Sequence, residues 1–285
     1  MTDCSLRAQV WKILLRVPAV DVAQYAALVG KGAFKGRDSE EYKQIRKDVG
    51  RTGFRKNPAF TKRVPDAKLS RVLNALLHSC ESEGIGYVQG LNIVASVFLY
   101  VMPEIDAFFT LRQFITHHCP LYYKKTQKGE KKEPPKEGED NHSRSWAVDA
   151  ALYLLDQCLQ VVDPGLHHHL KHFTTHLYLY TQYIYSFNAI VPLESGTSLD
   201  EVVKLWDFMF AFGAHLNILF TVARVIKARE EILHKKDKNI NVPQLIGNFD
   251  ADIIIDLTVH FVRLIPLELY QKLVLHTTEE LDFSS

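Results

Sequence analysis

Apolar residues recur along most of this chain at the spacing of one face of an α-helix. The repeat i, i+3, i+4, i+7, i+8 is clearest in Leu69, Val72, Leu73, Leu76, Leu77 and Cys80. Such a stripe is typical of a helix with one face in a hydrophobic core, because 3.6 residues complete a turn. We expect Asp66 to be the N-cap of this helix and Gly84 to end it.

Further helices are expected wherever the same spacing returns. The segment 87–102 is apolar on most sides, so this helix is expected at the centre of the core. The other predicted helices cover residues 102–118, 146–161, 167–188, 200–212, 216–234 and 253–264. No Asn-Gly or Asp-Gly hairpin turn stands between alternating residues, and β-branched runs are short. The sequence therefore predicts an all-α fold.

Composition narrows the classes of function. The chain has 285 residues, 47% of them hydrophobic, enough for a large core in one domain or in two joined lobes. Lys+Arg 34 against Asp+Glu 33 leaves a net charge of +1, so no overall field favours nucleic acid. The longest apolar run, 93–102, is about half of a membrane span. Four isolated cysteines and no signal peptide favour a reduced, cytoplasmic protein.

One stretch breaks the helical pattern. Residues 124–145 read KKTQKGEKKEPPKEGEDNHSRS, are highly charged and contain Pro134 and Pro135. Such a segment buries too little apolar surface to order itself. We expect a flexible loop that divides an N-terminal lobe of about 1–123 from a C-terminal lobe of about 146–285. A docking or phosphorylation role is the functional alternative to a tolerated insertion.

Two patterns suggest chemistry that their contexts do not favour. The glycines of GIGYVQG, residues 84–90, suggest a dinucleotide loop, but they follow a helix and have the spacing G-x-G-x-x-x-G. A His-rich segment places imidazoles on one helical face, as zinc sites require. It contains His167, His168, His169, His172 and His176. It has no H-E-x-x-H pattern, and neither Cys nor carboxylate stands at ligand spacing, so we expect no metal site.

The segment YKQIRKDVGRTGF, residues 42–54, combines a buried face with an oriented cation. Ile45 marks the buried face, and Asp48 precedes Arg51 by three residues. On a helix the two share one side, so the carboxylate can orient the guanidinium. Gly50 and Gly53 indicate that the helix ends here and that Arg51 projects from its tip. An ordinary surface ion pair would give the same pattern.

A second segment, EGIGYVQGLN, places Gln89 at the start of the most apolar stretch of the chain. A buried amide without partners costs about 1 to 3 kcal/mol. Gln89 is therefore satisfied either by the structure or by something outside the protein.

Together the two segments resemble the TBC family of Rab GTPase-activating proteins, whose signatures are I-x-x-D-x-x-R-T and Y-x-Q-G-[M]-N. The matching residues are Ile45, Asp48, Arg51 and Thr52, followed by Tyr87, Gln89, Gly90 and Asn92. Leu91 stands where Met is usual. LRAQVWKILL, with Trp11, and the segment with Trp206 and Asp207 resemble other parts of the family. The resemblance implies one TBC domain over 1–285, built of two packed helical subdomains, and is strongest to the short cell-cycle and septation branch.

The resemblance also implies residue roles. Arg51 is the expected arginine finger, and Gln89 is the expected second finger, which orients the attacking water. Supporting roles fall to Ile45, Asp48, Thr52, Tyr87, Gly90 and Asn92. Gly90 would leave room for close approach, and Asn92 would bond the loop backbone. Trp11, Trp206 and Asp207 are expected to be packing or helix-end residues.

The implied partner is a Rab-family small GTPase in its GTP-bound form. That GTPase carries GTP and Mg²⁺, so no cofactor is expected for this chain, and membrane contact is expected only through the GTPase. Partners would recruit the protein to membranes, the centrosome or spindle pole, or a cilium, and a second GAP subunit remains open. Two alternatives stay open as well. One is a pseudo-GAP that binds without accelerating hydrolysis, since Gly50 and Gly53 loosen the backbone beside Arg51. The other is a small-molecule enzyme that uses the Gly-rich segment.

Overall fold

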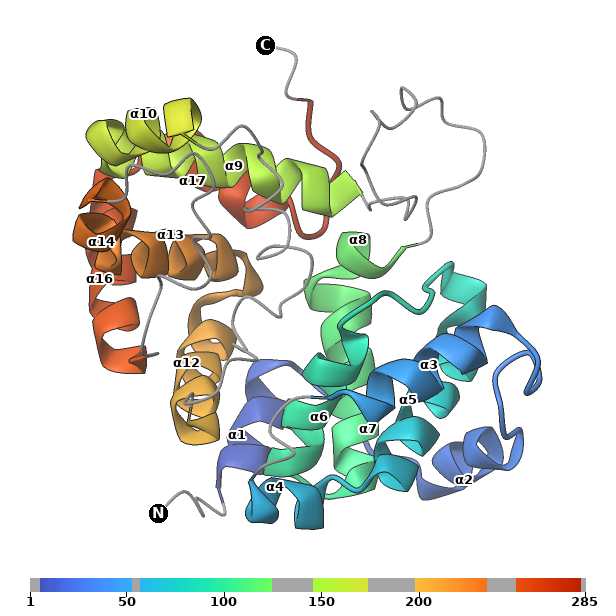
Figure 1. The fold of residues 1–285 in the computed structure, drawn as a ribbon. Coiled ribbons are helices and arrows are strands. Elements are labelled where there is room, and N and C mark those ends of the chain that lie inside the picture. The colour runs from blue at the N-terminus through green and yellow to red at the C-terminus, as the bar shows by residue number, and fades with distance from the viewer. Residues whose placement is uncertain (1–5, 53–56, 125–145, 174–197, 235–249, 283–285) are drawn as a thin grey trace.

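The structure, a computed structural model, describes residues 6–52, 57–124, 146–173, 198–234 and 250–282 (Figure 1). Within these ranges the chain forms helices and no strand, apart from one isolated antiparallel bridge between Ile85 and Lys124. The all-α prediction is therefore confirmed. The expected loop at 124–145 lies, except for Lys124, outside the described residues.

Two groups of helices make up the molecule (Figure 1). The first group comprises α1 (Arg7–Leu14), α2 (Val22–Gly30), α3 (Glu40–Gly50), α4 (Pro58–Arg63), α5 (Asp66–Cys80), α6 (Leu91–Val101), α7 (Glu104–Gln113) and α8 (Pro120–Tyr123). The second comprises α9 (Trp146–Val162), α10 (Pro164–Phe173), α12 (Leu199–Phe212), α13 (Asn217–Lys227), α14 (Arg229–His234), α16 (Ala251–Leu264) and α17 (Leu267–Leu275). The groups meet where α1 packs on α12 and α8 packs on α9. One apolar core runs through both, which confirms two packed helical subdomains.

An aromatic cluster holds the two groups together near the centre. Trp11 of α1 and Trp206 of α12 are fully buried, with ring centroids 5.9 Å apart. Phe98 of α6 lies 5.8 Å from Trp11 and 5.4 Å from Trp206. Because aromatic rings bury large apolar areas, this cluster fixes α1 and α6 of the first group against α12 of the second.

Helix ends differ from the sequence expectation in several places. α5 begins at Asp66 itself, since Pro65 adopts the extended conformation of an N-cap. It ends at Cys80, and a short 3₁₀ turn, Glu81–Glu83, separates it from Gly84, whose φ of 71° needs a residue without a side chain. The predicted helix 216–234 is interrupted at Ala228, between α13 and α14. The short helices α2, α4, α8 and α17 were not expected.

The central helix α6 begins at Leu91 and not at residue 87. The residues before Leu91 do not continue the hydrogen-bonding pattern of the helix. The Gly86 amide donates instead to the carbonyl of Tyr123 at 3.0 Å. Gly90 then has φ 95°, a left-handed conformation that interrupts any helix. The residues from Tyr87 to Gly90 therefore form a loop at the start of a buried helix.

Candidate functional site

The C-terminal end of α3 is held in place by packing on one side and capping at its start. The Ser39 hydroxyl accepts a hydrogen bond from the Tyr42 amide as N-cap. Ile45 and Val49 are buried, and α3 packs on α5 through this face. Arg51 follows Gly50 directly as the C-cap residue, so the packing of α3 positions it.

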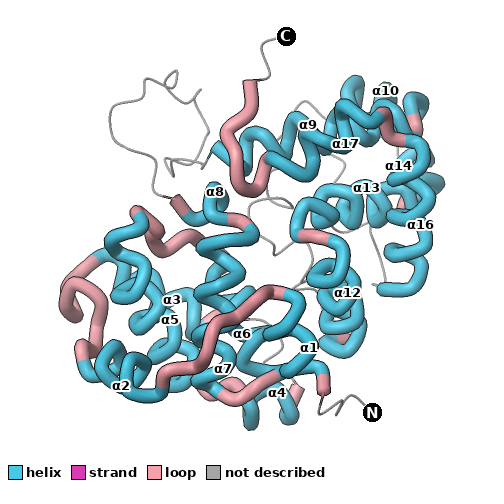
Figure 2. The backbone as a smooth tube through the Cα atoms, turned by 180° about the vertical axis from the view of Figure 1, so that it is seen from behind, coloured by secondary structure: helices cyan, strands magenta, loops and turns pink. Residues whose placement is uncertain are grey.

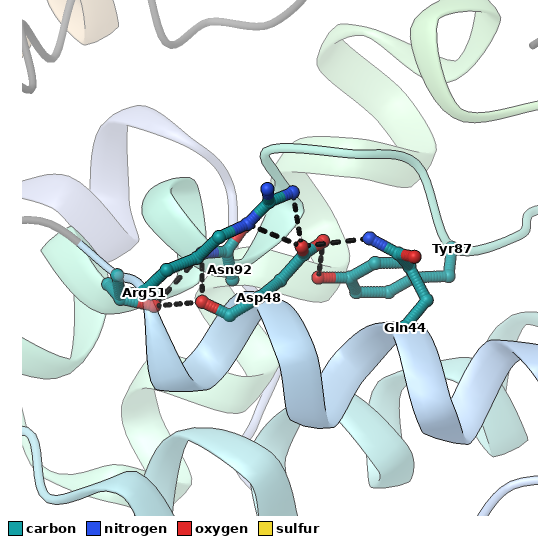
Figure 3. Close-up of polar contacts among 6 residues, drawn as sticks. Gln44, Asp48, Arg51, Tyr87 and Asn92 are labelled. Carbon is teal, nitrogen blue, oxygen red and sulfur yellow. Dashed lines mark hydrogen bonds and ion pairs between the residues drawn. The ribbon is translucent and has the colours of Figure 1, made fainter.

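The carboxylate of Asp48 gathers three side-chain donors at this point (Figure 3). It is 1% exposed, and its Oδ1 lies 2.6 Å from Arg51 Nη2. Oδ1 also accepts from Arg51 Nε at 3.0 Å and from Gln44 Nε2 at 2.8 Å. Oδ2 accepts from the hydroxyl of Tyr87 at 2.9 Å. The buried carboxylate thus orients a guanidinium that is itself 50% exposed.

The second signature segment is tied to the same helix end at two points. Tyr87 makes the first contact, through Asp48. Asn92, 3% exposed in the first turn of α6, donates to the Asp48 carbonyl at 3.1 Å and to Thr52 Oγ1 at 2.9 Å. Thr52 in turn donates to the Asp48 carbonyl at 3.0 Å. The two signatures, far apart in sequence, therefore form one polar cluster.

From the sequence we expected Asn92 to bond the loop backbone. Its amide instead donates to the Asp48 carbonyl and to Thr52, at the end of α3. The last carbonyls of a helix lack intrahelical partners, and a buried amide needs acceptors. The end of α3 supplies them, so Asn92 fastens α6 to α3.

Gln89 lies between the two residues that contact α3. The Leu91 amide donates to the Val88 carbonyl at 3.1 Å, which closes a tight turn around Gln89 and Gly90. The φ of 95° and ψ of −11° at Gly90 suit the third position of a type II turn, which favours glycine. Gln89 occupies the exposed corner of this turn. Its amide is therefore not buried in the core that follows.

The Tyr87 hydroxyl remains protonated and able to donate. Burial, followed by the negative charge of Asp48 and the hydrogen bond to it, raises the pKa of Tyr87 well above its usual range. Tyr87 therefore keeps the proton that it donates to Asp48.

Gln44 is a member of the cluster that sequence reasoning missed. It stands four residues before Asp48 on α3 and donates to it at 2.8 Å. An i, i+4 pair of Gln and Asp on one helix is a recognised stabilising pair, so the spacing alone was a usable signal.

Trp11, Trp206 and Asp207 lie in a different cluster, between α1 and α12. The two tryptophans are packing residues, as expected. Asp207 is in the body of α12, so the helix-end interpretation is wrong for it. Its Oδ1 accepts from the Trp11 indole at 2.7 Å and from Arg7 Nε at 3.0 Å.

In the described part of the His-rich segment, one histidine is paired with a carboxylate, and no metal cluster is present. His167 Nε2 lies 2.8 Å from Asp156 Oδ1, a carboxylate on α9 that the sequence did not suggest. Across the described ranges, no three His, Cys, Asp or Glu side chains are placed to hold a metal ion. His176 lies outside those ranges. Nor is any described helix both long and apolar enough to cross a membrane.

Comparison with known proteins agrees with this arrangement. A family model described as the Rab-GTPase-TBC domain matches residues 4–234. The putative mitotic check point protein BUB2 of Dictyostelium discoideum is 36% identical over 286 residues, covering 99% of this chain and 69% of that protein. The mitotic check point protein BUB2 of Saccharomyces cerevisiae is 32% identical, covering 96% of this chain and 84% of that protein.

A solved structure shares the fold. The Ypt/Rab-GAP domain of Gyp1p superposes with a TM-score of 0.64 at 15% identity, covering 90% of this chain and 87% of that one. Fold and sequence together define a domain of the GTPase-activating type, a class that acts on small GTPases. The chain belongs to the Rab-GTPase-TBC domain family.

Proposed function

We propose that this protein accelerates GTP hydrolysis by a Rab-type small GTPase, to which it supplies Arg51 and Gln89 in trans. The observation that carries the proposal is the half-exposed guanidinium of Arg51, oriented by a buried carboxylate. The loop bearing Gln89 is fastened to the same helix end through Tyr87 and Asn92. Membership of the family supports this assignment.

Arg51 would compensate charge that develops on the transferred phosphoryl group. A small GTPase hydrolyses GTP slowly because this charge is incompletely balanced and the water is poorly held. An arginine supplied in trans raises the rate by about 10³ to 10⁵. Nε and Nη2 already contact Asp48, while Nη1 has no partner among the described residues. Because Asp48 pre-orients the side chain, less rotamer entropy is lost on binding.

Gln89 would orient the attacking water. A carboxamide has an acceptor and a donor on one planar group, which suits a water that must be held and aimed. The corner of a tight turn exposes it to a docked partner. Gly90 permits that turn, and Asn92 fastens its far end.

The remaining expectations follow from this activity. GTP and Mg²⁺ would arrive with the GTPase, so this chain would need no cofactor of its own. Two relatives are named as mitotic check point proteins, which supports a role in cell-cycle control. The GTPase and any second GAP subunit would then recruit the protein to membranes, the spindle pole or a cilium.

A turnover assay tests the proposal. Purified protein is mixed with a panel of GTP-loaded Rab-type GTPases, and phosphate release is followed under single-turnover conditions. We expect Arg51→Ala to reduce the acceleration by about 10³ and Gln89→Ala by about 10². Arg46→Ala is the matched control, because Arg46 is exposed on the same helix.

Two results would contradict the proposal. One is the absence of acceleration for every GTPase in the panel. The other is acceleration that Arg51→Ala and Gln89→Ala leave unchanged. If the wild-type protein binds a GTPase without changing hydrolysis, the pseudo-GAP alternative is correct.

A further inference from the structure

Helix α1 carries apolar side chains on two faces, and only one of them is in the core. Trp11 and Leu15 are buried. On the outer face Leu6, Val10 and Ile13 are 59%, 46% and 74% exposed. Their spacing i, i+4, i+7 places them in one row, whereas a surface helix ordinarily shows polar residues there. Single exposed apolar residues need no explanation, but a contiguous row marks an interaction surface.

The row continues into a groove formed by α1 and the loop that leads to α2. Figure 2 shows this loop leaving α1 and crossing the molecule toward α2. The groove has a volume of about 550 Å³ and is lined by Ile13, Val17, Pro18 and Val20, with Lys12 and Arg16 among its polar residues. Among the residues that the structure describes, no carboxylate lines it. Apolar walls with a few placed polar groups are typical of a binding site.

Arg16 adopts a backbone conformation that is uncommon for a residue with a side chain. Its φ is 55°, in the left-handed region. It closes α1 in a Schellman motif, with the Arg16 amide donating to the Ile13 carbonyl and the Val17 amide to the Lys12 carbonyl. Glycine is usual at this position, and another residue is strained there by about 1 kcal/mol. A long cationic side chain thus lines the groove where α1 ends.

The groove is positively charged. Lys12 lies 2.9 Å from Asp106, which offsets its charge. Arg16 is exposed and has no partner within the described part of the chain. The charge of Arg16 contributes to lowering the pKa of the neighbouring His118, after burial, which is the main cause. From Leu6 to Arg16 the sequence contains no Asp or Glu.

We propose that α1 and the following loop bind an amphipathic helix of a partner protein, whose apolar residues cover the row while a carboxylate pairs with Arg16. A helix fits because the row is itself helical and ends in a hollow. A carboxylate fits because guanidinium pairs with it in two-point geometry. A second copy of α1 is disfavoured, because it would bring like charges together. None of these residues touches Asp48 or its donors, so the inference does not depend on the proposed GAP activity.

Two synthetic peptides of about 15 residues serve as probes, with leucines at i, i+4, i+7 and i+11. One has glutamates at its polar positions and the other has lysines. Fluorescence anisotropy with the full chain measures their affinity. We expect saturable binding of the acidic peptide, at least about tenfold tighter than that of the basic one, which corresponds to about 1.4 kcal/mol.

Variants separate docking from a structural role. Ile13→Glu should weaken the acidic peptide about tenfold or more, because Ile13 is the most exposed member of the row. Arg16→Gly should weaken it about fivefold while leaving the melting temperature unchanged or higher, since glycine accepts this φ without strain. Leu267→Glu, at an equally exposed position on α17, is the matched control and should change nothing.

Several outcomes would overturn the inference. These are no saturable binding below about 1 mM, equal affinity for both peptides, or an equal effect of Leu267→Glu. A dimer that Ile13→Glu abolishes would assign the surface to a second copy of the chain. Binding to anionic vesicles that Arg16→Gly abolishes would assign it to a lipid surface.

Discussion

The clusters around Asp48 and Asp207 are built from the same chemistry and have opposite exposure. In each, an aspartate accepts from an arginine and from an aromatic side chain. Asp48 is 1% exposed, and its partner Arg51 is 50% exposed. Asp207 is 39% exposed, and its partner Arg7 is 19% exposed. The first cluster hides the anion and presents the cation, whereas the second does the reverse.

This difference shows what each cluster is suited to do. A guanidinium held at its base by a buried carboxylate is available to a partner yet pre-oriented. Arg7 and Trp11 instead meet Asp207 between α1 and α12, where they join helices about 200 residues apart in the chain. One cluster is suited to binding and the other to assembly of the fold.

The largest expected effect is a difference in GTPase acceleration between substitutions of Arg51 and of Arg7. Arg51→Lys keeps a positive charge but loses the planar fork, so under the proposed function we expect GTPase acceleration to fall by about 10². Arg7→Lys should change it less than about twofold. Single-turnover phosphate release measures both. Equal losses would mean that the exposure of Arg51 has no functional meaning.

We also expect the loss of Asp48 to lower the free energy of unfolding more than the loss of Asp207. Asp48→Ala leaves Tyr87, Gln44 and Arg51 without their acceptor, and we expect a loss of about 3 kcal/mol. Asp207→Ala should cost about 1 to 2 kcal/mol, mainly through the Trp11 indole, since a partly exposed ion pair contributes little. Urea unfolding of both variants tests this order. A larger loss for Asp207→Ala would refute the comparison.

A neutral contact between the two groups of helices extends the comparison to pH. His276 is fully buried; its Nδ1 lies 2.6 Å from the Leu273 carbonyl and its Nε2 lies 2.9 Å from the Tyr122 hydroxyl. A carbonyl only accepts, so Nδ1 carries the proton and Nε2 accepts from Tyr122. Burial lowers the pKa of His276 to about 4.

The sign of the pH effect follows from that value. The unfolded chain takes up a proton below about pH 6.5, whereas the folded protein keeps His276 neutral until about pH 4. Its contribution to stability is complete above pH 6.5 and is lost as the pH falls. We expect a loss of about 2 to 3 kcal/mol between pH 7 and 4.5. In His276→Gln this part of the loss should be absent from urea unfolding, and an identical pH dependence would contradict the assignment.

The smallest effect concerns the glycine beside Arg51. Gly50 is helical, and an added Cβ would meet nothing within 4 Å. Gly50→Ala should therefore stabilise the protein by about 0.5 to 1 kcal/mol and leave acceleration intact. Gly213→Ala is the contrasting control, because φ is 125° there and a Cβ would strike His215, so the melting temperature should fall. Lost acceleration in Gly50→Ala would show that backbone freedom beside Arg51 is needed.

Local sequence rules predicted the helices that carry a long, regular row of apolar residues. They also predicted the ion pair between Asp48 and Arg51. The spacing from Leu69 to Cys80 gave α5 within a few residues, and the i, i+3 spacing placed Asp48 beside Arg51. They failed at the start of the central helix. Residues 87–90 were assigned to that helix, whereas the left-handed conformation of Gly90 places the start of α6 at Leu91.

The sequence by itself determined the fold class, the positions of the main helices and the presence of two separate polar signatures. Only the tertiary structure brought those signatures together, because Tyr87 and Asn92 reach Asp48 from 39 and 44 residues away. It likewise joined Arg7 to Asp207 across 200 residues. Helical periodicity encodes which side chains share a face within about two turns. Which faces meet depends on the packing of the whole core, and no local pattern records that choice.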